Sequence, residues 1–126
     1  MYRPDAATAP IHERDIAAVA VEALMGADGG TVSTLLTGPA RMTQREQVAA
    51  IGAVLGEDIA VSELERDQAL AQFTRFMPPE EAEPVLQFLD DAAAGNSPAT
   101  SAVADLLGRP AIGFTAWAAD HAADFA

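Results

Sequence analysis

The sequence predicts an α+β fold that is mostly helical and has a very small sheet. Three observations support this prediction. Apolar residues recur at the helical period over most of the chain, two short β-rich segments flank one predicted helix, and 50% of the 126 residues are hydrophobic. The length is that of one domain, so we expect residues 1–126 to form a single unit.

The N-terminal part is predicted to contain an extended lead-in, a helix and a strand. Residues 1–12 show no periodicity and include two prolines, which is typical of an extended segment. A helix is expected from Glu13, with Asp15 in the first turn, where the helix dipole favours a carboxylate. The glycine-rich turn at 26–30 is expected to end it, and the β-branched segment 31–37 predicts a strand.

The second predicted helix has the clearest local signal in the chain. Thr43 and Glu46 have the spacing of a capping box, and Gly56 follows the last apolar position. A second strand is expected at 59–63, where apolar residues alternate. Strand, helix and strand together have the size of a βαβ unit, so residues 13–64 are predicted to hold one helix and a parallel βαβ unit with a right-handed crossover.

Two parallel strands alone would leave both edges of the sheet unpaired. The sequence leaves three solutions open. The lead-in adds a third strand, the edge meets another chain, or the domain was once joined to a larger sheet.

Residues 65–126 are predicted to form a helical cluster. One helix is expected at 66–76, and a second is expected to begin at Pro78-Pro79, because proline and acids favour a first turn. Beyond a loop at 95–98, a short helix is expected at 99–107. A last helix is expected to carry Phe114, Trp117, His121 and Phe125 on one stripe.

Composition excludes several classes of function. The chain has nineteen acidic residues, seven arginines and no lysine, and a net charge of −12, so we expect neither nucleic-acid binding nor a role at an anionic membrane surface. It has no cysteine and only two histidines, so no disulfide and no metal site are expected. No apolar run is long enough for a membrane span, and we expect a cytoplasmic protein.

Four segments, in a fixed order along nearly the whole chain, resemble one known family. The first two are Ala9-Pro10-Ile11-His12-Glu13-Arg14-Asp15-Ile16-Ala17-Ala18-Val19-Ala20 and Leu36-Thr37-Gly38-Pro39. The other two are Thr43-Gln44-Arg45-Glu46-Gln47, with Gly52 and Leu55-Gly56, and Gly108-Arg109-Pro110 leading to Phe114-Thr115-Ala116-Trp117-Ala118. This series resembles the C-terminal, substrate-binding part of NmrA-like proteins, which are atypical short-chain dehydrogenases/reductases similar to NAD(P)-dependent epimerases.

The resemblance implies a truncated relative of the NmrA-like, extended short-chain dehydrogenase/reductase fold that lacks the Rossmann half. Family members begin with a strand and a glycine-rich turn that places the dinucleotide pyrophosphate at a helix N-terminus. None of the nine glycines here forms such a turn. The superfamily's Tyr-x-x-x-Lys pair is also absent, because there is no lysine and the single tyrosine is Tyr2. We therefore expect no cofactor and no hydride transfer by this chain alone.

The polar group His12, Glu13, Arg14 and Asp15 lies at a predicted helix start, which the resemblance places close to the family's cofactor and substrate cleft. His12 is a candidate acid/base group oriented by Glu13 or Asp15, since imidazole titrates near neutrality. The alternative is structural, with Asp15 capping or charging the helix and His12 satisfying backbone groups. For His121 we expect a partly buried side chain on the aromatic stripe.

Apolar substrate contacts are expected in the part that resembles the family's substrate lid. The candidates, together with Arg14, are Phe73, Phe76, Met77 and Phe88. At helical spacing, such residues also form ordinary core, and that is the alternative.

Three functional hypotheses follow. The first is a stand-alone, cofactor-independent enzyme or binding domain for an apolar small molecule, which would isomerise, cyclise or dehydrate it by shape and proton transfer. The alternatives are a complementing or regulatory subunit that docks on a full-length reductase, and a fragment of an NAD(P)H-dependent oxidoreductase. Self-association as a homodimer, through the sheet edge or an exposed helical face, is the default expectation, and a full-length reductase is the alternative partner.

Overall fold

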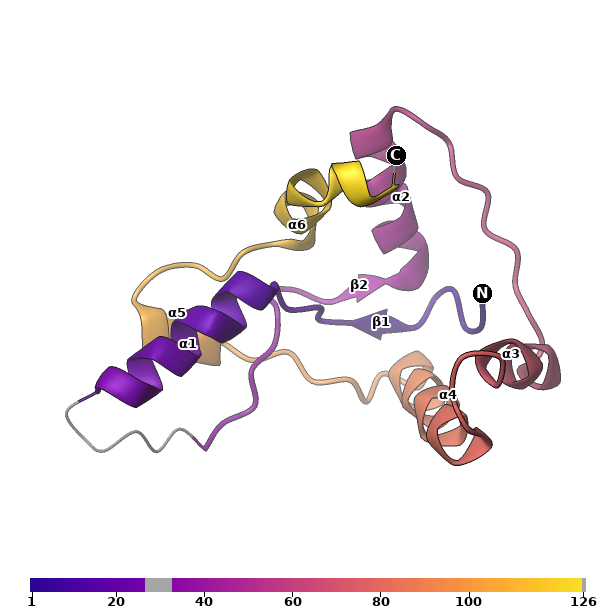
Figure 1. Ribbon diagram of the computed structural model, residues 1–126, viewed down its shortest axis with the longest axis horizontal. Helices are drawn as coiled ribbons and strands as arrows, with labels where there is room; N and C mark the ends of the chain where they lie inside the picture. The colour runs from indigo at the N-terminus through magenta and orange to yellow at the C-terminus, as the bar shows by residue number, and fades with distance from the viewer. Residues whose placement is uncertain (27–32, 126) are drawn as a thin grey trace.

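The computed structural model describes residues 1–26 and 33–125, and helices dominate it (Figure 1). This confirms the mostly helical α+β class. The elements, in order, are β1 (Ala7–Thr8), α1 (Glu13–Met25), β2 (Met42–Thr43), α2 (Gln44–Leu55), α3 (Arg66–Phe73), α4 (Pro79–Ala93), α5 (Ala102–Leu107), α6 (Phe114–Asp120) and a 3-10 turn (Ala122–Phe125).

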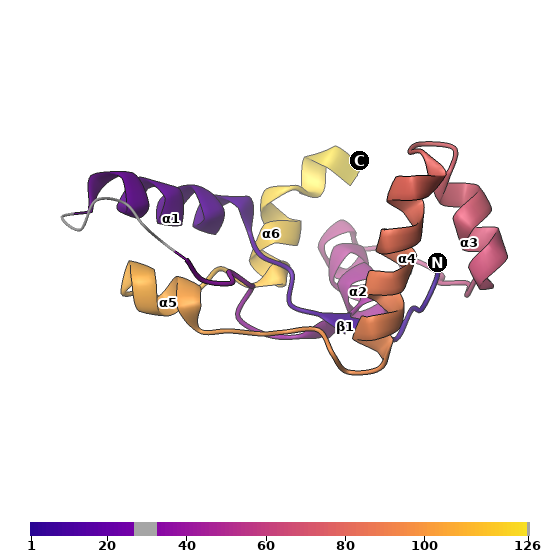
Figure 2. The same cartoon turned by 90° about the horizontal axis from the view of Figure 1, so that it is seen from below.

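The helices pack in three pairs along the long axis of the molecule. Figure 2 shows α1 beside α5 at one end and α3 beside α4 at the other, and α2 contacts α6 between them. The small sheet runs through the middle of the molecule and joins these pairs (Figure 1). Near the middle of the molecule, the start of α1 contacts both the end of α6 and the segment before α6.

The prediction of a parallel βαβ unit is wrong. The sheet has two strands, β1 and β2, which run antiparallel with Ala7 opposite Thr43 and Thr8 opposite Met42. Residues 33–37 and 59–63 are extended but form no ladder, while the predicted turn at 28–30 and the start of the first predicted strand lie outside the described residues.

Pairing partners explain this difference. The lead-in supplies one strand, as one of the three solutions proposed, but it pairs with the residues just before α2. Just after the segment 33–37, the Gly38 N–H donates a backbone hydrogen bond to the Ala9 carbonyl of the lead-in, at 3.0 Å. The segment 59–63 is held at its end by Met1, whose ammonium donates to the Ser62 carbonyl at 2.8 Å. The β-rich sequence of these two segments therefore does not make them strands, because no strand of the described residues pairs with them.

The capping signals of α2 are confirmed. The Thr43 hydroxyl accepts a hydrogen bond from the Glu46 N–H at 3.1 Å, and the Glu46 carboxylate accepts the Thr43 N–H at 2.7 Å. Gly56 ends the helix with a φ of 71°, the left-handed conformation that glycine adopts without steric cost.

A buried cluster joins the lead-in to the α3–α4 pair. Leu86 of α4 and Ala69 of α3 are almost fully buried with Tyr2, and Leu64, Leu70, Phe73 and Leu89 pack around them. Helix α3 ends at Phe73, earlier than the predicted 76, because the chain turns there before Pro78 begins the cap of α4. α5 begins at Ala102, three residues later than the predicted 99. No helix within residues 1–26 and 33–125 has the length and apolar character needed to cross a membrane.

Candidate functional site at the start of helix α1

His12 is the residue just before α1, and it caps this helix. Its Nδ1 accepts a hydrogen bond from the Arg14 N–H at 3.1 Å, and only 1% of the residue is exposed. The structural role proposed for His12, satisfying a backbone group, is therefore present. Because Nδ1 is the acceptor, the neutral ring carries its proton on Nε2.

The Nε2 of His12 is buried and has no hydrogen-bond partner. The Oδ2 atom of Asp120, at the end of α6, lies 3.4 Å away but makes no hydrogen bond with it. That oxygen instead accepts from the Arg14 guanidinium at 2.9 Å. A buried donor without an acceptor is costly, so a ligand that offered an acceptor to Nε2 would remove that cost.

Glu13 connects the start of α1 to the end of α6. Its carboxylate lies 2.9 Å from Nε2 of His121 and 3.3 Å from Nδ1 of His12. The pKa of Glu13 is lowered, first by a hydrogen bond from its own backbone N–H and then by the charges that His12 and His121 can carry. His121 stacks on Trp117, with ring centroids 4.7 Å apart, as the aromatic stripe predicted.

Asp15 is fully buried and ties α1 to the segment before α6. Its Oδ2 accepts the Ile112 N–H at 2.7 Å, and Oδ1 lies 2.8 Å from the Arg109 guanidinium. This ion pair falls short of hydrogen-bond geometry. Asp15 is thus engaged away from the His12 ring, and Glu13 is the carboxylate of the predicted pair that approaches His12.

A pocket of about 200 Å³ lies beside this cluster. It is lined by Pro10, Ile11, His12, Ile112, Phe114 and Trp117. The Phe114 and Trp117 rings stack with centroids 5.0 Å apart and form an aromatic wall. The sequence did not single out Ile112 or Asp120 for this site, since only the fold brings the segment before α6 and the end of α6 to the start of α1.

The predicted apolar substrate residues do not gather at this pocket. Phe73 packs on the buried α3–α4 cluster, and with Phe76 and Gln72 it lines a separate hollow of about 240 Å³. Phe76 is 82% exposed, and Met77 follows it in the turn after α3. Phe88 lines another hollow, against the lead-in and the segment around Leu36. The expected single site, made of His12, Arg14 and these side chains, is therefore split into three places.

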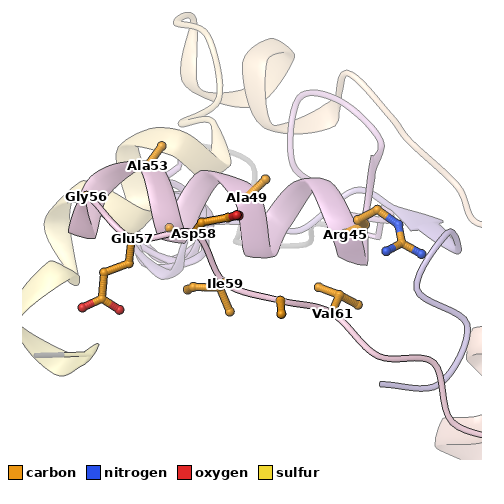
Figure 3. A pocket seen from close by; sticks show the side chains of 10 residues that line it. Arg45, Ala49, Ala53, Gly56, Glu57, Asp58, Ile59 and Val61 are labelled. Atoms are coloured by element: carbon orange, nitrogen blue, oxygen red, sulfur yellow. The ribbon is translucent and has the colours of Figure 1, made fainter.

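A larger hollow, an open groove of about 640 Å³, lies between α2 and the segment 57–61 (Figure 3). Figure 3 shows Arg45 towards one end of this groove and Glu57 towards the other, with Asp58 and apolar side chains such as Ile59 and Val61 between them. Arg45 is paired with Asp5, at 3.0 Å. The groove also carries the carboxylates of Glu57 and Asp58, which are neighbours in the sequence, but it contains no histidine. Nowhere in the described parts of the chain do three possible metal ligands cluster.

Comparison with known proteins finds a sequence relative and structural neighbours, while no protein-family model matches the chain. The chain is 38% identical over 123 residues to the (4-alkanoyl-5-oxo-2,5-dihydrofuran-3-yl)methyl phosphate reductase of Streptomyces griseus, an alignment that covers 97% of this chain and 44% of the relative. The fold of this chain matches that of the NADPH-dependent quinone oxidoreductase QOR2 of Escherichia coli, solved with NADPH, with a TM-score of 0.75. The match covers 94% of this chain and 43% of that one, at 18% sequence identity. The chain thus spans less than half the length of either protein and has the fold of part of an oxidoreductase.

Proposed function

We propose that this chain forms the substrate side of an NAD(P)H-dependent reductase and acts with a dinucleotide-binding part that these 126 residues do not contain. The observation that carries the proposal is the match of nearly the whole chain to less than half of a reductase at 38% identity. The resemblance to the substrate-binding part of NmrA-like proteins gives the proposal its finer form.

The sequence supports the proposal that the dinucleotide is bound by another part. It has no glycine-rich turn after a strand and no lysine, so it lacks both the phosphate-binding turn and the Tyr-x-x-x-Lys pair of the superfamily. The fold is consistent with a missing neighbour. Within the described residues, the segments 33–37 and 57–65 belong to no strand ladder, and the second bonds to the lead-in through Met1, whose ammonium donates to the Ser62 carbonyl and whose carbonyl accepts the Leu64 N–H. A larger sheet would pair such segments.

An exposed apolar face on α1 gives a place for such a neighbour. Leu24 and Met25 are 86% and 82% exposed, and Val21, which shares their side of the helix at 3.6 residues per turn, is 53% exposed. Apolar side chains that stand together in this way mark interaction surfaces. Association as a homodimer would cover the same face, and it is an outcome that the experiment below separates from the proposal.

The comparisons favour this reading over a stand-alone, non-redox enzyme. The sequence relative is a reductase, and no finding supports isomerisation, cyclisation or dehydration by His12, Glu13 and Asp15. The contacts of these residues are largely structural, since His12 caps α1 and Asp15 binds the Ile112 amide.

The test is complementation. The chain would be mixed with the remaining part of the S. griseus reductase, the part it does not match, and NADPH oxidation followed with that enzyme's substrate. We expect no oxidation from the chain alone or from the other part alone, and turnover from the mixture. Turnover by the chain alone, or none from a mixture of folded parts, would contradict the proposal.

Two variants of α1 provide matched controls. Leu24→Gln removes an exposed apolar side chain, whereas Glu22→Gln changes an exposed polar one on the same helix. Burying a leucine contributes about 1.5–3 kcal/mol, so we expect Leu24→Gln to raise the concentration needed for half-maximal turnover by roughly tenfold or more and Glu22→Gln to leave it unchanged. Equal effects of the two variants would place the contact elsewhere. A size-exclusion profile of each part identifies a homodimer.

A further inference from the structure

The pocket beside His12 has features of a ligand site that do not depend on a dinucleotide. His12 contributes to its wall, and the Nε2–H of this ring is a buried donor without a partner. Buried polar groups in native proteins are almost always satisfied, so an unsatisfied one next to a pocket points to a bound acceptor. The other ring nitrogen, Nδ1, accepts a hydrogen bond from the Arg14 N–H, so the neutral ring carries its proton on Nε2.

Size and lining limit the ligand. A cavity of about 150 Å³ lined by apolar side chains accommodates a benzene ring, so this pocket of about 200 Å³ has room for one ring with a small substituent. Apart from His12, its lining is apolar or aromatic, with Trp117 and Phe114 stacked on one side. Such walls favour the flat or hydrophobic face of a ring.

The surrounding charges disfavour an anion. Around His12, the carboxylates of Glu13, Asp15 and Asp120 outnumber the guanidiniums of Arg14 and Arg109. Both arginines are already in contact with a carboxylate, at 2.9 and 2.8 Å. With a net charge of −12 on the whole chain, the local potential repels phosphates and carboxylates.

Asp120 controls access to the donor. Its Oδ2 lies 3.4 Å from Nε2 without a hydrogen bond, and its side chain is 45% exposed. The Asp120 carboxylate is held in place by an ion pair with Arg14, whose side chain is 68% exposed. Ion pairs at the surface contribute little to the stability of the fold. Asp120 can therefore turn aside at small cost when a better acceptor arrives.

We infer that this pocket binds an uncharged, single-ring molecule whose carbonyl oxygen accepts a hydrogen bond from Nε2 of His12, with Asp120 displaced. The ring lies against Trp117 and Phe114. The inference concerns binding by this chain itself, and it stands whether or not the chain completes a reductase.

The test uses three small probes and the only tryptophan of the chain, Trp117, as reporter. Cyclohexanone has the ring and the acceptor, benzene has a ring without an acceptor, and cyclohexanecarboxylate has the ring and a negative charge. The indole N–H resonance is followed by NMR while each probe is titrated. We expect a saturable shift with cyclohexanone, weaker binding of benzene, and no saturable shift with the carboxylate.

Three variants separate the hydrogen bond from the pocket. His12→Asn keeps a cap for α1 but lacks the distant N–H, so cyclohexanone affinity should fall about five- to tenfold, to the level of benzene. Asp120→Ala uncovers Nε2 and should tighten cyclohexanone binding without changing that of benzene. Ile112→Phe fills the pocket and should abolish both. Thermal midpoints confirm that each variant is folded.

Four results would overturn the inference, and the first three concern the unaltered protein and the His12→Asn variant. They are a benzene affinity equal to that of cyclohexanone in the unaltered protein, an unchanged cyclohexanone affinity in folded His12→Asn, and tighter binding of the carboxylate than of the ketone. Weaker cyclohexanone binding by Asp120→Ala would assign the donor contact to Asp120 instead and would also overturn it.

Discussion

Asp15 provides a sharp test of whether the polar group at the start of α1 is structural. The substitution Asp15→Ala removes the acceptor of the buried Ile112 N–H and the partner of Arg109. A hydrogen bond to a charged group is worth about 1.5–3 kcal/mol, and leaving its donor buried forfeits that amount. Arg109 is 42% exposed, so its ion pair adds at most about 1 kcal/mol. We expect a loss of about 2–4 kcal/mol in the free energy of unfolding.

The assay is urea denaturation followed by far-ultraviolet circular dichroism, with two companion variants. Asp15→Asn retains an oxygen for the Ile112 N–H and should cost only about 1 kcal/mol, and Arg109→Ala should cost no more than that. A loss below about 0.5 kcal/mol for Asp15→Ala would refute the reasoning. So would equal losses for Asp15→Ala and Asp15→Asn, because the backbone contact would then not be the dominant one.

Three further predictions concern the rest of the fold. Hydrogen bonds from Tyr2 and then from Arg3 lower the pKa of Asp90 below its ordinary 3.8. The ionised carboxylate therefore stabilises the fold above that pH, and this contribution is lost as the pH falls through the lowered pKa. In urea denaturation, the stability advantage of the unaltered protein over Asp90→Asn should shrink below about pH 3.8. Thr43→Ala should cost about 1 kcal/mol in the same assay, and Thr43→Ser should restore most of it, because a serine also caps. Gly38→Ala should cost roughly 1–3 kcal/mol or more and lower the thermal midpoint, since an added Cβ would lie 1.9 Å from the Pro10 carbonyl oxygen.

Each of these has a clear contrary result. An Asp90→Asn difference that grows in acid would reverse the sign of the linkage. Unaltered stability of Thr43→Ala would mean that the capping box does not stabilise α2. Gly38→Ala with an unchanged thermal midpoint would mean that the lead-in can shift away without cost.

Local signals in the sequence predicted the helices well. The capping box at Thr43 and the glycine at 56 depend only on residues within one or two turns, and both have the expected geometry. The same holds for the proline start of α4 and for the stripe that stacks His121 on Trp117. Such contacts are short in sequence, so a pattern in the chain is enough to predict them.

Strand pairing and the composition of the site could not be predicted in this way. A β-rich segment such as 33–37 becomes a strand only if a partner lies beside it, and the partner is set by the whole fold. The pocket at His12 combines residues about a hundred positions apart, and the ties that build it, such as the Asp15 contact with the Ile112 N–H, have no periodicity to reveal them. The grouping of Phe73 and Phe88 with His12 rested on the family resemblance and on helical spacing, and the structure places these side chains in different hollows.

The central claim is that this chain supplies the substrate side of a reductase and depends on another part for its dinucleotide. Calorimetric titration with NADPH tests it most directly, first with the chain alone and then with the chain mixed with the remaining part of the S. griseus reductase. We expect no saturable heat from the chain alone and saturable binding once the second part is present. Saturable binding of NADPH by the folded chain alone would contradict it, because these residues would then hold a dinucleotide without a glycine-rich turn.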